Sequence, residues 1–110
     1  MTDMGVEQRR YERVAGPFDG CRVTSSIETP MRIYDLSEGG CLINGIHATP
    51  AVGHSLVLKI DLPMEGWIIV TAQAVYERPG AFAVRFTDMT ADARMRLERA
   101  LHSLRVSPDR

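Results

Sequence analysis

The chain lacks an excess of charge of either sign and has few aromatic residues. Its 110 residues carry 13 Lys and Arg against 14 Asp and Glu, which gives a net charge of -1. A nucleic-acid binder needs a basic excess to neutralise phosphates, and a single-strand binder also needs aromatic residues, which make up only 6% here. We therefore expect no nucleic-acid partner. Any anion site in this chain must be local and built from a few arginines.

Cysteine is scarce as well. Cys21 and Cys41 are the only two, and neither has a second cysteine or a histidine nearby at the spacing of zinc ligands. We therefore interpret them as small core-facing residues in a reducing compartment. The spacing of His47, His54 and His102 also suits no metal site, so we expect these histidines at the surface and no bound metal.

The sequence also lacks long apolar runs and catalytic motifs. No stretch approaches the length of a membrane span, and the first residues, MTDMGVEQRR, lack the apolar region of a signal peptide. There is no nucleophile elbow, triad spacing or phosphate-cradling glycine loop. We therefore expect a cytoplasmic protein that is not inserted in a membrane, is not an enzyme and uses no cofactor.

What is present is a series of short apolar stretches with the two-residue period of β-strands. The clearest example runs from Leu56 to Leu62 and places its leucines and Ile60 on one face. Further strands are predicted over Cys21–Glu28 (closed by Pro30), Met31–Leu36, Cys41–Ile46, Trp67–Glu77 and Ala81–Phe86. Glycine and proline in the intervening segments favour turns and loops. Short strands at this regular spacing indicate a small barrel or sandwich.

The period changes after the last predicted strand. Thr90 is a suitable N-cap, and apolar residues then recur at helical spacing. These residues are Leu97, Leu101 and Leu104, supported by Met95 and Ala100. We therefore predict a C-terminal helix of roughly fifteen residues that covers one opening or face of the sheet.

Three arginines near the N-terminus form the first candidate site. Arg9, Arg10 and Arg13 fall within five positions. A guanidinium can grip a phosphate or the O6/N7 edge of guanine with two parallel hydrogen bonds, and it can stack on a purine. The cluster therefore suits a guanine nucleotide. The alternative is a solvated basic tail without a specific partner.

The segment Asp35-Leu36-Ser37-Glu38-Gly39-Gly40 is the second candidate site. At the strand period, Asp35 and Ser37 fall on one face of the strand end, so that a carboxylate and a hydroxyl lie side by side. Asp35 could accept from the N1–H and N2–H edge of guanine, while Gly39 and Gly40 would permit unusual backbone conformations and close approach of a ligand. The alternative is a β-turn in which Asp and Ser bond their own backbone.

Taken together, the two segments resemble the PilZ domain family. Arg9-x-x-x-Arg13 fits the family's first motif, and Asp35-x-Ser37-x-x-Gly40 fits its second. The stretch from Gly80 to Phe86 is similar to a later segment in which an apolar strand ends in Arg-Phe. The resemblance covers about residues 7 to 105, and the two motifs at this separation are more specific than either alone.

The resemblance implies a fold dominated by β-structure, a six-stranded antiparallel β-barrel with a C-terminal α-helix. It implies binding of cyclic di-GMP, with Arg9 and Arg13 on phosphates and guanine edges and Arg10 adding either a contact or only charge. It further implies Asp35 and Ser37 on a base or phosphate. We place the domain at residues 9–105, with a flexible N-terminal tail at 1–8 and a C-terminal tail at 106–110. One bound ligand or an intercalated pair both remain open.

The expected function is that of a cyclic di-GMP receptor or adaptor. Ligand binding would change the conformation of the N-terminal segment and signal to a protein partner in motility, biofilm or exopolysaccharide control. The alternative is a PilZ-like interaction module that does not bind nucleotide. The complete motifs favour the receptor.

Overall fold

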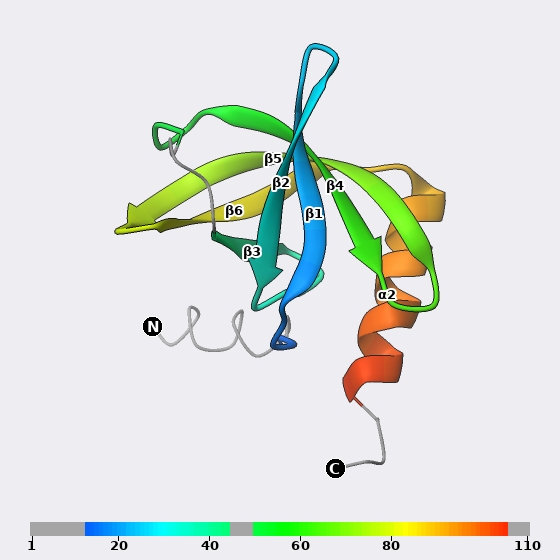
Figure 1. The fold of residues 1–110 in the computed structure, drawn as a ribbon. Helices are drawn as coiled ribbons and strands as arrows, with labels where there is room; N and C mark the ends of the chain where they lie inside the picture. Colours follow the sequence, from blue (N-terminus) through cyan, green and yellow to red (C-terminus); the bar gives the residue numbers. More distant parts are fainter. Residues whose placement is uncertain (1–12, 45–49, 106–110) are drawn as a thin grey trace, which may run out of the picture.

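The fold is a closed barrel of antiparallel strands with one helix. The computed structural model describes residues 13–44 and 50–105. In these ranges the elements are β1 (Phe18–Thr24), β2 (Ile27–Tyr34), β3 (Gly40–Asn44), β4 (Ser55–Leu62), β5 (Gly66–Arg78), β6 (Ala81–Asp88) and α2 (Ala91–Arg105). The strands follow the order β1-β2-β3-β6-β5-β4, and β4 pairs with β1 to close the ring (Figure 1). The predicted six-stranded barrel with a C-terminal helix is confirmed.

The core fills the inside of the barrel, as the alternation of apolar residues predicts. On β4, the four apolar residues at alternate positions from Leu56 to Leu62 are all buried. On β6, Phe82 is fully buried and Val84 nearly so. Burying each large side chain of this kind contributes about 1.5 to 3 kcal/mol, so this interior is the main source of stability.

The helix α2 begins and packs as its sequence indicates. The amide of Ala93 donates to the Oγ1 of Thr90 at 3.0 Å, which makes Thr90 the N-cap. Leu97 and Leu101 are fully buried against the barrel, and Leu104 packs on the same core while partly exposed. The inclusion of Met95 in this face was wrong, because its side chain is 48% exposed.

The turn between β4 and β5 fastens the helix to the barrel. Glu65 accepts from Arg99 through both carboxylate oxygens, at 2.8 and 3.2 Å, and its carbonyl oxygen accepts from Arg96 at 2.7 Å. Arg96 also bridges to Asp92 one helical turn earlier, at 3.0 Å. These contacts tie two elements that lie far apart in the sequence.

The beginning of the barrel differs from the prediction. Instead of one strand over Cys21–Glu28, the chain forms a hairpin in which β1 and β2 meet at Ser25 and Ser26. Pro30 does not close a strand but lies inside β2, paired with Cys21. The ladder between β2 and β3 covers only Arg32 to Tyr34. Pro30 therefore lies where β2 has a neighbour on one side only, a position at which a missing N–H is tolerated.

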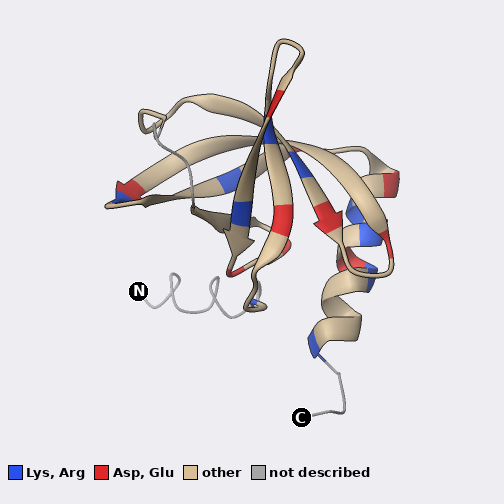
Figure 2. Ribbon diagram, in the orientation of Figure 1, with Lys and Arg blue, Asp and Glu red and all other residues tan. Residues whose placement is uncertain are grey.

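Charges of both signs are spread over the barrel. Figure 2 shows basic and acidic residues interspersed along the described strands rather than gathered by sign on one side. The basic residues are denser on α2, where Arg96 and Arg99 are engaged with acidic partners. Among residues 13–44 and 50–105, no helix has the length and apolar character needed to cross a membrane.

Candidate functional site

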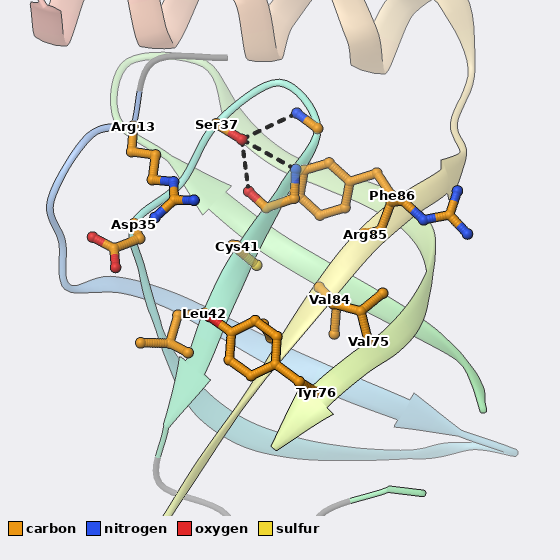
Figure 3. A pocket seen from close by; sticks show the side chains of 13 residues that line it. Arg13, Asp35, Ser37, Cys41, Leu42, Val75, Tyr76, Val84, Arg85 and Phe86 are labelled. Carbon is orange, nitrogen blue, oxygen red and sulfur yellow. Dashed lines mark hydrogen bonds between the residues drawn. The ribbon is translucent and has the colours of Figure 1, made fainter. Parts of the chain in front are cut away.

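A cavity of about 590 Å³ opens on the outer side of β3, β6 and β5, next to the turn that joins β2 to β3 (Figure 3). It brings together the five predicted site residues that the structure describes. Its lining consists of Arg13, Asp35, Ser37, Gly39, Gly40, Cys41, Leu42, Val75, Tyr76, Ala83, Val84, Arg85 and Phe86. Arg9 and Arg10, together with the proposed tails at 1–8 and 106–110, lie outside the described residues.

Arg13 is held beside Asp35 by a short backbone bridge. The amide of Val14 donates to the carbonyl oxygen of Leu36 at 2.8 Å, and the amide of Leu36 donates back at 2.9 Å. The residue before each partner is a predicted site residue, so the bridge brings the two motifs together across 22 positions of sequence. In Figure 3 the guanidinium of Arg13 extends towards the carboxylate of Asp35. Both side chains are exposed and therefore accessible to a ligand.

The expectation that Asp35 and Ser37 share a face of the strand is wrong. Asp35 follows the end of β2 with a φ of 49°, a left-handed conformation that Asp tolerates better than most residues. This break in the strand turns the Asp35 side chain outwards, while Ser37 is 7% exposed. The two residues line one cavity because the chain bends there.

The Ser37 hydroxyl organises the turn. It accepts from the amides of Gly39 (3.1 Å) and Gly40 (3.2 Å), and it donates to the carbonyl oxygen of Gly40 at 3.2 Å. The amide of Ser37 also donates to that carbonyl at 2.9 Å. The alternative raised by the sequence, a turn stabilised by its own side chain, therefore describes Ser37. Its hydrogen-bonding capacity is used within the loop.

The two glycines serve the turn differently from the prediction. Neither Gly39 nor Gly40 is among the residues with a positive φ. A side chain at Gly40 would collide with the carbonyl oxygen of Val84, because Gly40 starts β3 directly against β6. Gly40 is thus required for close approach of two strands, which places the turn at the rim of the cavity.

Sequence reasoning missed two polar lining residues. Tyr76 lies on β5 beyond a bulge between Ala74 and Tyr76, with its side chain 46% exposed. The Cζ of Arg78 lies 5.5 Å from the centre of the Tyr76 ring, and its Nη2 donates to the Tyr76 hydroxyl at 3.3 Å. Arg85 lies on β6 opposite Gly40. The Arg-Phe ending of the last strand is the signal that could have found Arg85, although it was used only for the family resemblance. No motif indicates Tyr76, because the bulge that positions it has no sequence signature.

Cys41 belongs to the cavity lining, but its side chain is buried. Both cysteines are free, and Cys41 is buried as predicted, whereas Cys21 is half-buried near Glu28. Burial raises the pKa of the Cys41 thiol well above its ordinary value, so it stays neutral. His54 and His102 are exposed as expected, and His47 lies outside the described residues. Within the described ranges, no three His, Cys, Asp or Glu side chains gather as metal ligands would.

Solved structures share this architecture. The inhibitor of motility MotI/DgrA of Bacillus subtilis aligns with a TM-score of 0.71 at 20% identity, over 91% of this chain and 53% of that one. The PilZ domain of Escherichia coli YcgR with c-di-GMP aligns at 0.65 and 22% identity, over 89% and 92%. A longer YcgR chain in complex with c-di-GMP aligns at 0.68 and 25% identity, over 89% and 46%.

This chain thus spans about half the length of MotI/DgrA and of the longer YcgR chain. A comparison with curated protein sequences gives no match. The PilZ domain, in contrast, matches residues 7–103, which is nearly the whole sequence. Because this match includes both motifs and the barrel that brings them together, the chain belongs to the PilZ domain family.

Proposed function

We propose that this protein is a cyclic di-GMP receptor. PilZ domains are non-catalytic binding modules, and two of the similar YcgR structures hold c-di-GMP. The observation that carries the proposal is the meeting of Arg13, Asp35 and the Ser37–Gly40 turn around one cavity. Its volume of about 590 Å³ is in the range of small-molecule sites.

The lining offers a complementary group for each part of the ligand. Arg13, joined by Arg9 and Arg10, would bind the phosphates and the O6/N7 edge of guanine. The exposed Asp35 carboxylate would accept from the N1–H and N2–H edge. The ring of Tyr76 provides a stacking surface for a base. Ser37 and Gly40 act indirectly in this proposal, since they hold the turn that carries Asp35.

Energetics favour several arginines acting together. Fixing the backbone of residues 9–13 costs on the order of 5 to 10 kcal/mol at about 1 to 2 kcal/mol per residue. Charge-assisted hydrogen bonds each return roughly 1.5 to 3 kcal/mol. Four or five such bonds, with base stacking, would offset the cost and leave a site of roughly micromolar affinity. One arginine alone would not.

Calorimetric titration tests the proposal. We expect cyclic di-GMP to bind in preference to GTP and cyclic GMP, and Arg13→Ala, Arg9→Ala or Asp35→Ala to lose most of this affinity with the fold intact. Arg94→Ala is the matched control, because it removes one exposed arginine of α2 outside the cavity lining. No binding to the wild-type chain would support the alternative, an interaction module that does not bind nucleotide.

The output follows from the same geometry. We propose that the ligand fixes the segment carrying Arg9 and Arg10 over the cavity and thereby forms a new surface for a partner protein. Motility is one candidate process, because MotI/DgrA is named an inhibitor of motility; biofilm and exopolysaccharide control are others. Hydrogen exchange of residues 1–12 should slow when cyclic di-GMP is added. Unchanged exchange at saturation would contradict this output.

A further inference from the structure

Arg85 is a cation of the cavity lining whose partner is neutral. Its Nη2 donates to the Oε1 of Gln73 on the neighbouring strand β5 at 2.6 Å. Among the described residues, no carboxylate forms an ion pair with Arg85. In Figure 3 its guanidinium is turned away from Arg13 and Asp35. Arg85 therefore lies at the rim of the cavity without an ion-pair partner among the described residues, and its guanidinium does not point into the Arg13 side of the cavity.

Gln73 links Arg85 to a turn outside the cavity. Its Nε2 donates to the carbonyl oxygen of Gly53 at 3.2 Å. The same turn is joined to β5 by two backbone hydrogen bonds, from the Gly53 amide to the Ala74 carbonyl at 2.7 Å and from the Ala74 amide to the His54 carbonyl at 2.9 Å. A continuous chain of polar contacts thus runs from the cavity rim through Gln73 to the turn at Ala51–His54.

We propose that Arg85 binds a phosphate of the ligand and that Gln73 is a positioning residue that holds Arg85 aside until the ligand arrives. This inference rests on the proposed function and deepens it. A phosphodiester is charged and can accept two parallel hydrogen bonds from one guanidinium. The Gln73 amide oxygen is neutral and accepts only one, so Arg85 should bind the phosphate in preference to Gln73. The change of partner frees the Gln73 side chain and is transmitted to the turn at Ala51–His54.

Calorimetry with cyclic di-GMP tests the role of Arg85. We expect Arg85→Ala to weaken binding about tenfold or more, because it removes a charged hydrogen-bond donor, while Arg85→Lys retains part of the affinity. Arg94→Ala should bind like the wild type. Thermal unfolding of each variant shows whether the fold is kept. Equal affinities of the wild type and a folded Arg85→Ala would overturn the proposal.

The Gln73→Ala variant tests whether Gln73 holds Arg85 aside, separately from whether Arg85 binds the ligand. Removing the competing bond should tighten cyclic di-GMP binding two- to threefold when Arg85 is present. The Gln73→Ala/Arg85→Ala double variant should bind with the same affinity as Arg85→Ala alone. A coupling of this kind requires the two side chains to act on each other. Unchanged or weaker binding by Gln73→Ala alone would show that Gln73 does not hold Arg85 aside.

Nuclear magnetic resonance reads the transmission directly. During titration of the wild type with cyclic di-GMP, the side-chain NH2 signals of Gln73 and the amide signal of Gly53 should shift. At saturation of Arg85→Ala, they should stay in place. Shifts of the same size in both proteins would overturn the transmission. Absence of any binding by the wild type would instead refute the proposed function, whereas normal binding by Arg85→Ala refutes this inference alone.

Discussion

Ser37 shows how a motif can lead to the residues of one cavity without revealing their local structure. The spacing of the Asp35–Gly40 segment led to five lining residues that the structure describes, counted with Arg13. The roles could not be predicted, because the strand period assumes extended backbone and Asp35 departs from it with a φ of 49°. That departure separates an exposed acceptor, Asp35, from a buried organiser, Ser37. This one backbone angle decides which of the two side chains is exposed to a ligand of the proposed site.

Replacing Ser37 tests its role as an organiser. Ser37→Ala leaves the amides of Gly39 and Gly40 without their acceptor, so we expect a loss of about 1 to 3 kcal/mol in the free energy of unfolding. Urea denaturation measures it. Ser103→Ala, on the exposed side of α2, should stay within about 0.5 kcal/mol of the wild type. Equal stability of the two variants would assign Ser37 to ligand contact instead.

At the level of elements, the sequence pattern predicted the strands and the helix whose formation depends on burying their own apolar residues. The strand β4 and the helix α2 were found because their buried residues repeat at a fixed spacing, and β5 because it is rich in β-branched residues. The hairpin of β1 and β2 was missed for a different reason. A proline normally ends a strand, because it has no N–H to donate to a neighbouring strand. Pro30 is tolerated inside β2 because the ladder between β2 and β3 is short and does not reach it. Such pairing lengths depend on the whole barrel.

The helix cap offers a test at this scale. Thr90→Ala removes the acceptor of the Ala93 amide and should lower the free energy of unfolding by about 1 kcal/mol. Thr90→Ser keeps an oxygen at the same position and should retain most of the stability. Chemical denaturation of the two variants side by side distinguishes them. If Thr90→Ser loses as much as Thr90→Ala, methyl packing rather than capping explains the loss.

The contact between Glu65 and α2 predicts a pH dependence. The hydrogen bond from Arg99, followed by the charges of Arg99 and Arg96, lowers the pKa of Glu65 below its ordinary value of 4.5. A carboxylate with a depressed folded pKa stabilises the protein above its unfolded pKa, and this contribution is lost as the pH falls through the folded pKa. Glu65→Gln should therefore unfold at a lower temperature than the wild type at pH 7.

Lowering the pH supplies the control for that comparison. Once the pH falls below 4.5, the wild type should lose its advantage progressively, and the unfolding curves of the two proteins should converge. Differential scanning calorimetry across this range measures the gap. A difference that stays constant from pH 7 to the acid limb would mean that the charge of Glu65 does not contribute through Arg99.

For the whole molecule, the barrel class and its helix were predictable, and the position of the site was not. The two motifs lie in separate segments, and the Val14–Leu36 bridge that joins them has no sequence signature. Most of the apolar and aromatic lining comes from β5 and β6, later in the chain. The pairing of β3 with β6, two strands far apart in the sequence, brings these segments to one face.

Ligand binding should stabilise the entire barrel. If cyclic di-GMP binds the folded chain alone, a concentration of one hundred times the Kd adds about 2.7 kcal/mol. For a chain of this size, that corresponds to a rise in Tm of roughly 10 °C or more. Thermal-shift measurements should show this rise for the wild type, little for Arg13→Ala and none with GTP at the same concentration. An equal rise for Arg13→Ala would place the ligand elsewhere.

Ring closure also limits how another protein can recognise this one. In the described part of the chain each strand has a partner on either side over at least part of its length. Stretches with a neighbour on one side only remain at strand ends, such as the first residues of β2, and within the described residues an incoming peptide could extend the sheet only over such short stretches. A protein that recognised the ligand-bound state of the proposed receptor would therefore contact mainly side chains and loops, and a closed barrel offers little edge by which two copies could join.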